Sequence, residues 1–259
     1  MNKDIFIKPK LTAIQKICLA GLFIALTTIF QKVTAINYIA VLPFLRISIG
    51  GPAMIIFSSI TLGPWYGLLV GAASDILGYF IFDMSGYGFF PQITAIYALL
   101  GFVSYFVFHL FRQIKNKKII FTIQLASIVL MICGITAFLF TRDTMQLYST
   151  TYEINILTRI LVPCILLALS AAMIASILFI NKKKKDEFPL ANTFSLSFAC
   201  FILEVFVMVL FGCLMKALAF GFQTYIVILI TQIIVLFFNI PINTVVVSLL
   251  LRLMERYYK

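Results

Sequence analysis

The chain has 259 residues, of which 63% are hydrophobic and 11% are charged, and its formal net charge is +11. A soluble domain would carry about 25% charged residues, because polar groups must cover its surface. This composition excludes a secreted disulfide scaffold, a disordered chain and a nucleic-acid binder, since the basic residues lie in short tracts between apolar runs. We therefore predict a polytopic membrane protein, with the bilayer as its surroundings.

Eight apolar runs are long enough, or nearly so, to cross a bilayer, which takes about 20 residues. In chain order they cover residues 12–32, 47–62, 65–82, 92–111, 119–140, 157–180, 193–214 and 222–251. Gly51-Pro52 and Gly63-Pro64 interrupt the sequence around the short second and third runs, which is typical of helices packed against protein. The predicted fold is an all-α helical bundle of about eight transmembrane helices.

The distribution of basic residues predicts the orientation in the membrane. Of the 20 lysines and arginines, 15 fall in four segments: up to residue 16, at 112–118, at 182–185 and at 252–259. Cytoplasmic segments carry an excess of Lys and Arg. With eight spans, this pattern predicts that both termini are cytoplasmic.

Two connections on the predicted outer side have unusual chemistry. The first, 37–48, is apolar and holds Arg46, whose guanidinium can bind a carboxylate through two hydrogen bonds. The second, 83–92, combines flexible glycines with aromatic rings that suit stacking on a planar ligand. The alternatives are an interfacial loop with an arginine reaching the headgroups, and an ordinary turn with an aromatic belt.

Four polar residues of the predicted spans are candidates for a functional or structural role, because polar and above all ionisable groups are costly inside a membrane. Asp75 follows a stretch of small residues and either links helices, takes part in conformational change or contacts a ligand. Glu204 has no basic neighbour in sequence and either has a structural partner or is protonated facing lipid. Asn239 and Asn243 are one helical turn apart around Pro241, and either face a pocket or join helices by hydrogen bonds.

No catalytic, cofactor or metal site is predicted. The sequence has no GxxxxGK[ST] phosphate-binding loop and no HExxH or GxSxG motif. It has a single histidine, and its five cysteines form no CxxC pair. We therefore expect a protein that is not an enzyme and that has no ATP site of its own.

Three stretches resemble a known family: Pro43-Phe-Leu-Arg46-Ile-Ser48-Ile-Gly50, Leu62-Gly-Pro followed by Asp75-Ile-Leu-Gly78, and Gly88-Phe-Phe-Pro91. They are similar to the FLRISFG, LGPxxGxxxGxxxDxxG and FFPGFT elements of the substrate-binding S components of energy-coupling factor (ECF) vitamin importers, and of the folate family in particular. The resemblance is specific over residues 12–111 and weaker at 239–244, in the predicted last helix at 222–252.

The resemblance implies an S component that captures folate or a reduced folate outside a bacterial-type plasma membrane. It also implies partners: a transmembrane coupling subunit and two ATPase subunits. The small residues Ala20, Gly21 and Ala25 of the first helix are the expected docking face. The expected ligand-binding residues are Arg46, Ser48, Tyr87, Phe89, Phe90, Gln92, Thr94 and Asn243.

The sequence departs from the family pattern in three ways. Gln92 replaces the glycine of FFPGFT, the arginine expected early in the last helix is absent, and the chain has eight predicted spans where the family has six. We expect an additional helical hairpin within 115–220. A stand-alone secondary transporter or channel is the alternative function, and a membrane enzyme or assembly factor is a further one that would need a catalytic cluster.

Overall fold

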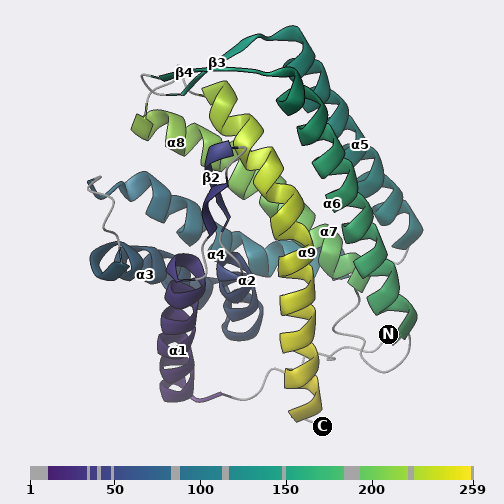
Figure 1. Cartoon of the computed structure of the whole chain (residues 1–259). Coiled ribbons are helices and arrows are strands. Elements are labelled where there is room, and N and C mark those ends of the chain that lie inside the picture. Colours follow the sequence, from purple (N-terminus) through teal and green to yellow (C-terminus); the bar gives the residue numbers. More distant parts are fainter. Residues whose placement is uncertain are drawn as a thin grey trace.

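A computed structural model describes residues 11–33, 36–39, 42–47, 50–82, 88–112, 117–147, 150–183, 193–220 and 225–257 (Figure 1). The long helices are α1 (Ala13–Lys32), α3 (Pro64–Phe82), α4 (Pro91–Arg112), α5 (Lys117–Thr141), α6 (Ile156–Lys183) and α9 (Tyr225–Tyr257), with the short α2 (Gly51–Leu62) between α1 and α3. One further span joins α7 (Thr193–Leu203), a π-helix η1 (Glu204–Phe211) and α8 (Gly212–Phe220). The all-α polytopic membrane fold is confirmed.

Seven helices of the described chain are long and apolar enough to cross a membrane. The second predicted span differs, because α2 starts at Gly51 and not at Ile47, and has only 12 residues. Gly50 has φ 86°, a backbone conformation that favours glycine, and Pro52 follows at the start of the helix. At 1.5 Å per residue, α2 is about 18 Å long and cannot cross a hydrocarbon core of about 30 Å by itself.

Two short antiparallel ribbons accompany the helices. Strands β1 (Ile36–Ile39) and β2 (Leu42–Ile47) pair with Ile36 opposite Ile47, and β2 packs against α9. Strands β3 (Thr144–Leu147) and β4 (Thr150–Glu153) join α5 to α6, and β3 also contacts α9. Both ribbons therefore reach the same long helix (Figure 1).

Helices α1–α4 form a tight group in which α3 and α4 make the closest contact. A Cβ atom added at Gly101 would overlap the carbonyl oxygen of Gly67, and one added at Gly71 would overlap that of Tyr97. The two backbones are therefore in direct contact, as small residues allow in membrane helices.

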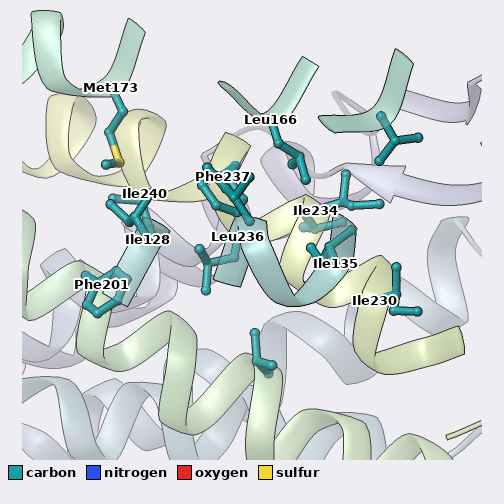
Figure 2. Close-up of a cluster of buried hydrophobic side chains, with 14 of the residues drawn as sticks. Ile128, Ile135, Leu166, Met173, Phe201, Ile230, Ile234, Leu236, Phe237 and Ile240 are labelled. Carbon is teal, nitrogen blue, oxygen red and sulfur yellow. The ribbon is translucent and has the colours of Figure 1, made fainter. Parts of the chain in front are cut away.

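The α5–α6 hairpin stands on the other side of α9 (Figure 1) and packs mainly on α7 and α9. Its buried aliphatic side chains, including Ile128, Ile135, Leu166 and Met173, meet Phe237 and its neighbours on α9 (Figure 2). This second apolar cluster is separate from the one that α1–α4 build with α7 and the end of α9.

Candidate ligand-binding and docking sites

The β1–β2 ribbon makes up most of the outer connection that the sequence predicts at 37–48. Arg46 lies on β2 opposite Asn37, in the ribbon that packs against α9. Arg46 lies one residue before the end of β2 at Ile47, while Ser48 lies outside the described residues. The structure thus brings the segment that carries Arg46 to the last helix, 180 or more residues away in sequence.

The second outer segment leads directly into α4. Phe89 is 38% exposed, and its ring lies 5.3 Å from that of Tyr79 and stacks at 6.2 Å on Phe80. Phe90 is half-buried, and the side-chain oxygen of Gln92 is buried without a hydrogen-bond partner. Tyr87 lies outside the described residues. The predicted aromatic segment therefore does present exposed and half-exposed rings beside an unsatisfied amide oxygen.

Thr94 and Asp75 form a buried link between α4 and α3. The Thr94 hydroxyl donates a hydrogen bond of 2.7 Å to Oδ2 of Asp75, and both side chains are buried. Of the roles considered for Asp75, the structure shows a polar contact between helices. The donor of Thr94, one of the predicted ligand-binding residues, is engaged in this contact.

A second buried polar link joins η1 to α9. Nδ2 of Asn243 donates a hydrogen bond of 2.7 Å to Oε1 of Glu204, and both residues are about 2% exposed or less. Asn239 also lies beside the Glu204 carboxyl group, and Lys216 is the nearby basic residue. The sequence did not predict which residue contacts Glu204. In the structure, the contacts are Asn239 and Asn243, the two asparagines that the sequence analysis singled out.

Both helices of this second link depart from regular α geometry where they meet. The amide of Gly212 donates to the carbonyl of Val207, five residues back, as a π-helix requires. Pro241 lies inside α9 between the two asparagines and has no amide to donate. π-Segments are rare, and where they occur they are often close to functional sites.

The predicted docking residues of α1 divide between two faces. Ala20 is buried against the bundle, at 7% exposure, whereas Gly21 and Ala25 are exposed. A Cβ atom added at Gly21 would meet nothing within 4 Å. Gly21 and Ala25 are four residues apart on one outward face of α1, while Ala20 belongs to its inward face.

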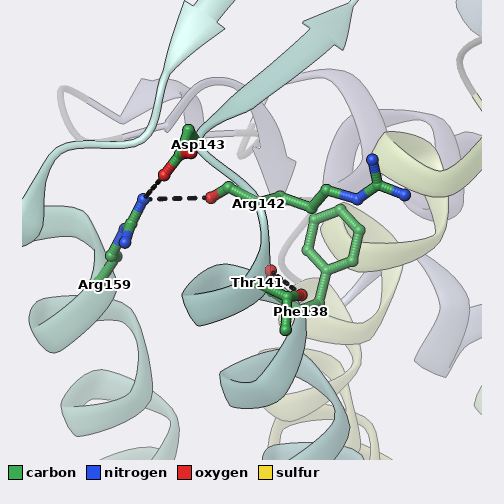
Figure 3. A network of polar contacts seen from close by, with 5 residues as sticks. All are labelled: Phe138, Thr141, Arg142, Asp143 and Arg159. Carbon is green, nitrogen blue, oxygen red and sulfur yellow. Dashed lines mark hydrogen bonds and ion pairs between the residues drawn. The ribbon is translucent and has the colours of Figure 1, made fainter.

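An ion pair that the sequence analysis did not predict lies where the β3–β4 ribbon joins α5 and α6. We call this region, which contains Arg142, Asp143, Ile154 and Arg159, the neck of the ribbon. Arg159 pairs with Asp143 and also donates a hydrogen bond of 3.3 Å to the carbonyl of Arg142 (Figure 3). The amide of Ile154 donates to the carbonyl of Asp143 at 2.8 Å. The 16-residue separation of the charged partners gave no local signal of this pairing.

Described residues contain no group of three or more His, Cys, Asp or Glu that could hold a metal ion. All five cysteines are free thiols. The polar groups of the candidate site are instead amides, hydroxyls and carboxyls, which suit hydrogen bonding to an organic ligand.

The long apolar helices, the buried polar links between them and the ribbons packed on α9 define a multi-pass membrane protein with polar groups enclosed in its bundle. The chain belongs to the family of ECF transporter substrate-specific components, whose family model matches residues 15–180. A search of curated proteins and a search of solved structures found no match. The family is one of transporter components, and its match covers α1 to α6 and both ribbons.

Proposed function

We propose that this substrate-specific component captures a vitamin, with folate or a reduced folate as the leading candidate, on the outer side of a bacterial-type plasma membrane. Both termini are cytoplasmic in this proposal. The ligand passes inward after the protein docks onto a transmembrane coupling subunit driven by two ATPase subunits. The observation that carries the proposal is the family match over residues 15–180, with the Arg46 ribbon packed on α9 as its structural support.

The proposed ligand site lies between the β1–β2 ribbon and the start of α4. Arg46 supplies a guanidinium for a carboxylate, and the rings of Phe89 and Phe90 offer faces for a planar group. The unsatisfied oxygen of Gln92 is an acceptor for a ligand N–H group. The proposed set of ligand-binding residues is completed by Ser48, Tyr87, Thr94 and Asn243. Thr94 and Asn243 each use one donor to bind Asp75 and Glu204, and their remaining hydrogen-bonding groups serve the ligand in this proposal.

We propose that α5–α6 is the additional hairpin expected within 115–220. Its main packing partners are α7 and α9. Helices α1–α4, α7 and α9 also contact one another directly, and these contacts do not involve α5 or α6. In this arrangement the hairpin is an insertion between α4 and α7, almost entirely inside the part of the chain that the family model matches. The exposed face of α1 that carries Gly21 and Ala25 is the proposed docking face for the coupling subunit.

Equilibrium binding to the purified full chain tests the ligand, with no partner and no ATP present. Calorimetry across folates and other water-soluble vitamins is the better method, because Trp65 is at the far end of α3 from the candidate site. The 17 residues from Trp65 to Phe82 correspond to about 25 Å of helix. Nanomolar binding of a folate supports the proposal, tight binding of another vitamin replaces folate, and binding of none contradicts a solitary receptor.

The role of Arg46 is tested by substitution. Arg46→Ala is expected to weaken ligand binding by about 1.5–3 kcal/mol, because it removes a charge-assisted hydrogen bond to the ligand carboxylate. Arg46→Lys is the matched variant, which keeps the charge but loses the planar pair of donors. Unchanged affinity of Arg46→Ala in calorimetry would remove Arg46 from the site.

The proposed docking face is tested by replacing its small side chains with larger ones. Gly21→Leu or Ala25→Leu is expected to block assembly with the coupling subunit, because a bulky side chain prevents close approach of helices. Ligand affinity and thermal stability should be retained, since Gly21 has open space around it. Co-purification with the coupling subunit and ATPases is the readout. Normal assembly of both variants would move docking to another face.

A further inference from the structure

The basic residues on the proposed outer side differ in how they are used. Lys32 and Lys216 each interact with another group, and Arg159 pairs with Asp143. Arg142 is exposed, and within the described part of the chain its guanidinium has no hydrogen bond or ion pair. The side chain of Arg46 is not described. Arg142 is therefore the outer cation, among those described here, whose charge is available.

The neck of the β3–β4 ribbon fixes the backbone at Arg142. Its amide donates a hydrogen bond of 3.2 Å to the carbonyl of Phe138, and its own carbonyl accepts from Arg159. The Arg142 side chain then extends past the ring of Phe138, in the direction opposite to Arg159 and toward the yellow-green ribbon of the C-terminal part of the chain (Figure 3). The backbone of Arg142 is therefore held by two hydrogen bonds, and its guanidinium lies on the side away from Arg159.

The position of this neck relates Arg142 to the proposed ligand site. Strand β3 begins two residues after Arg142 and contacts α9, and α9 is also the helix on which the Arg46 ribbon packs. Arg142 is carried by the α5–α6 hairpin and Arg46 by the α1–α2 connection. Two arginines from separate parts of the chain therefore approach one helix on elements that we place on the outer side.

We propose that Arg142 is a second anion-recognition residue of the ligand site, and that the ligand is an anion carrying a carboxylate. The inference rests on the proposed function. A guanidinium offers paired N–H donors in the geometry of a carboxylate, and an exposed cation also accelerates the association of an opposite charge. Arg159 is the contrasting residue, because its charge is already neutralised by Asp143.

The test measures association kinetics of the purified full chain in nanodiscs of zwitterionic lipid. The probes are folate, biotin and pantothenate as carboxylates, riboflavin as a ligand without net charge, and thiamin as a cation. For a carboxylate that the wild type binds, Arg142→Gln should lower the association rate constant about three- to tenfold at low salt. The variant should also respond less to a rise from about 50 mM to about 300 mM salt. Arg142→Lys should recover most of the rate.

Lys16→Gln is the matched control, because it removes one positive charge at the proposed cytoplasmic end and should leave the rate unchanged. Phenylglyoxal labelling read by mass spectrometry adds a measurement on the wild type. Arg142 should react faster than Arg159, and the bound carboxylate should protect it.

The outcomes separate the two proposals. Binding of none of the probes overturns the proposed function and this inference together. If only thiamin or riboflavin binds tightly, the proposal that the protein captures a vitamin is retained. The proposal that its ligand is an anion is then overturned. Binding of a carboxylate with an unchanged rate in Arg142→Gln, or with Arg142 unprotected from phenylglyoxal, overturns the role of Arg142 alone.

Discussion

The α3–α4 pair and the η1–α9 pair are both buried helix contacts, but different interactions hold them. Gly67 and Gly101 bring α3 and α4 so close that their backbones touch, and Asp75 and Thr94 add one hydrogen bond. The second pair is joined by Glu204 and its asparagines where a π-helix faces a proline-containing helix. The first contact has no room for added atoms, whereas the second has irregular helices joined by hydrogen bonds.

The two helix contacts are expected to differ in how much the helices can move against each other. Close packing of backbones fails when any volume is added, because interiors are already dense. A hydrogen-bonded contact between irregular helices can instead exchange its hydrogen-bond partners. We therefore expect α3–α4 to behave as a rigid unit and the η1–α9 region to be the more adaptable one.

The largest effect is expected from Gly101→Ala, because the new methyl group would overlap the carbonyl oxygen of Gly67. We expect a loss of about 3 kcal/mol or more, or failure to fold, since the backbones must separate. Gly134→Ala on α5 is the control, because nothing lies within 4 Å of its added Cβ. Thermal stability in detergent is the measurement, and equal stability of the two variants would contradict the close α3–α4 contact.

A smaller effect is expected at Glu204. Glu204→Leu leaves the buried amide of Asn243 without its acceptor, which costs about 1–3 kcal/mol. Glu204→Gln keeps an oxygen at the same place and should retain most of the stability. Chemical or thermal unfolding of both variants decides the point, and a leucine variant as stable as the glutamine variant would show that the link contributes nothing.

The smallest of the three effects is expected at Thr94. Thr94→Val keeps the shape of the side chain but removes the hydrogen bond to Asp75, and such bonds in membranes contribute about 0.5–2 kcal/mol. Thr94→Ser keeps the hydroxyl and is the control. If Thr94 also contacts the ligand, as proposed, the valine variant lowers ligand affinity beyond its effect on stability, which calorimetry on the folded protein measures separately.

The sequence predicted the spans well, because a run of apolar residues needs only its length and composition to be recognised. It could not predict that Asp75 meets Thr94 or that Glu204 meets Asn243, since these pairs are 19 and 39 residues apart and depend on how helices pack. The β1–β2 ribbon was also missed. Its residues, such as Leu42 and Ile47, continue the apolar run into α2 without the alternation that indicates a strand.

The shortness of α2 has a consequence for water. If its inner end, at Leu62, is level with the membrane surface, a helix of about 18 Å leaves its outer end about 12 Å short of the opposite surface. The chain before Gly50 then crosses that depth as a ribbon, and edge groups of a ribbon are not satisfied by lipid. Such backbone persists at membrane depth only against protein or beside trapped water, so we expect water at those parts of the β1–β2 ribbon that α9 does not cover.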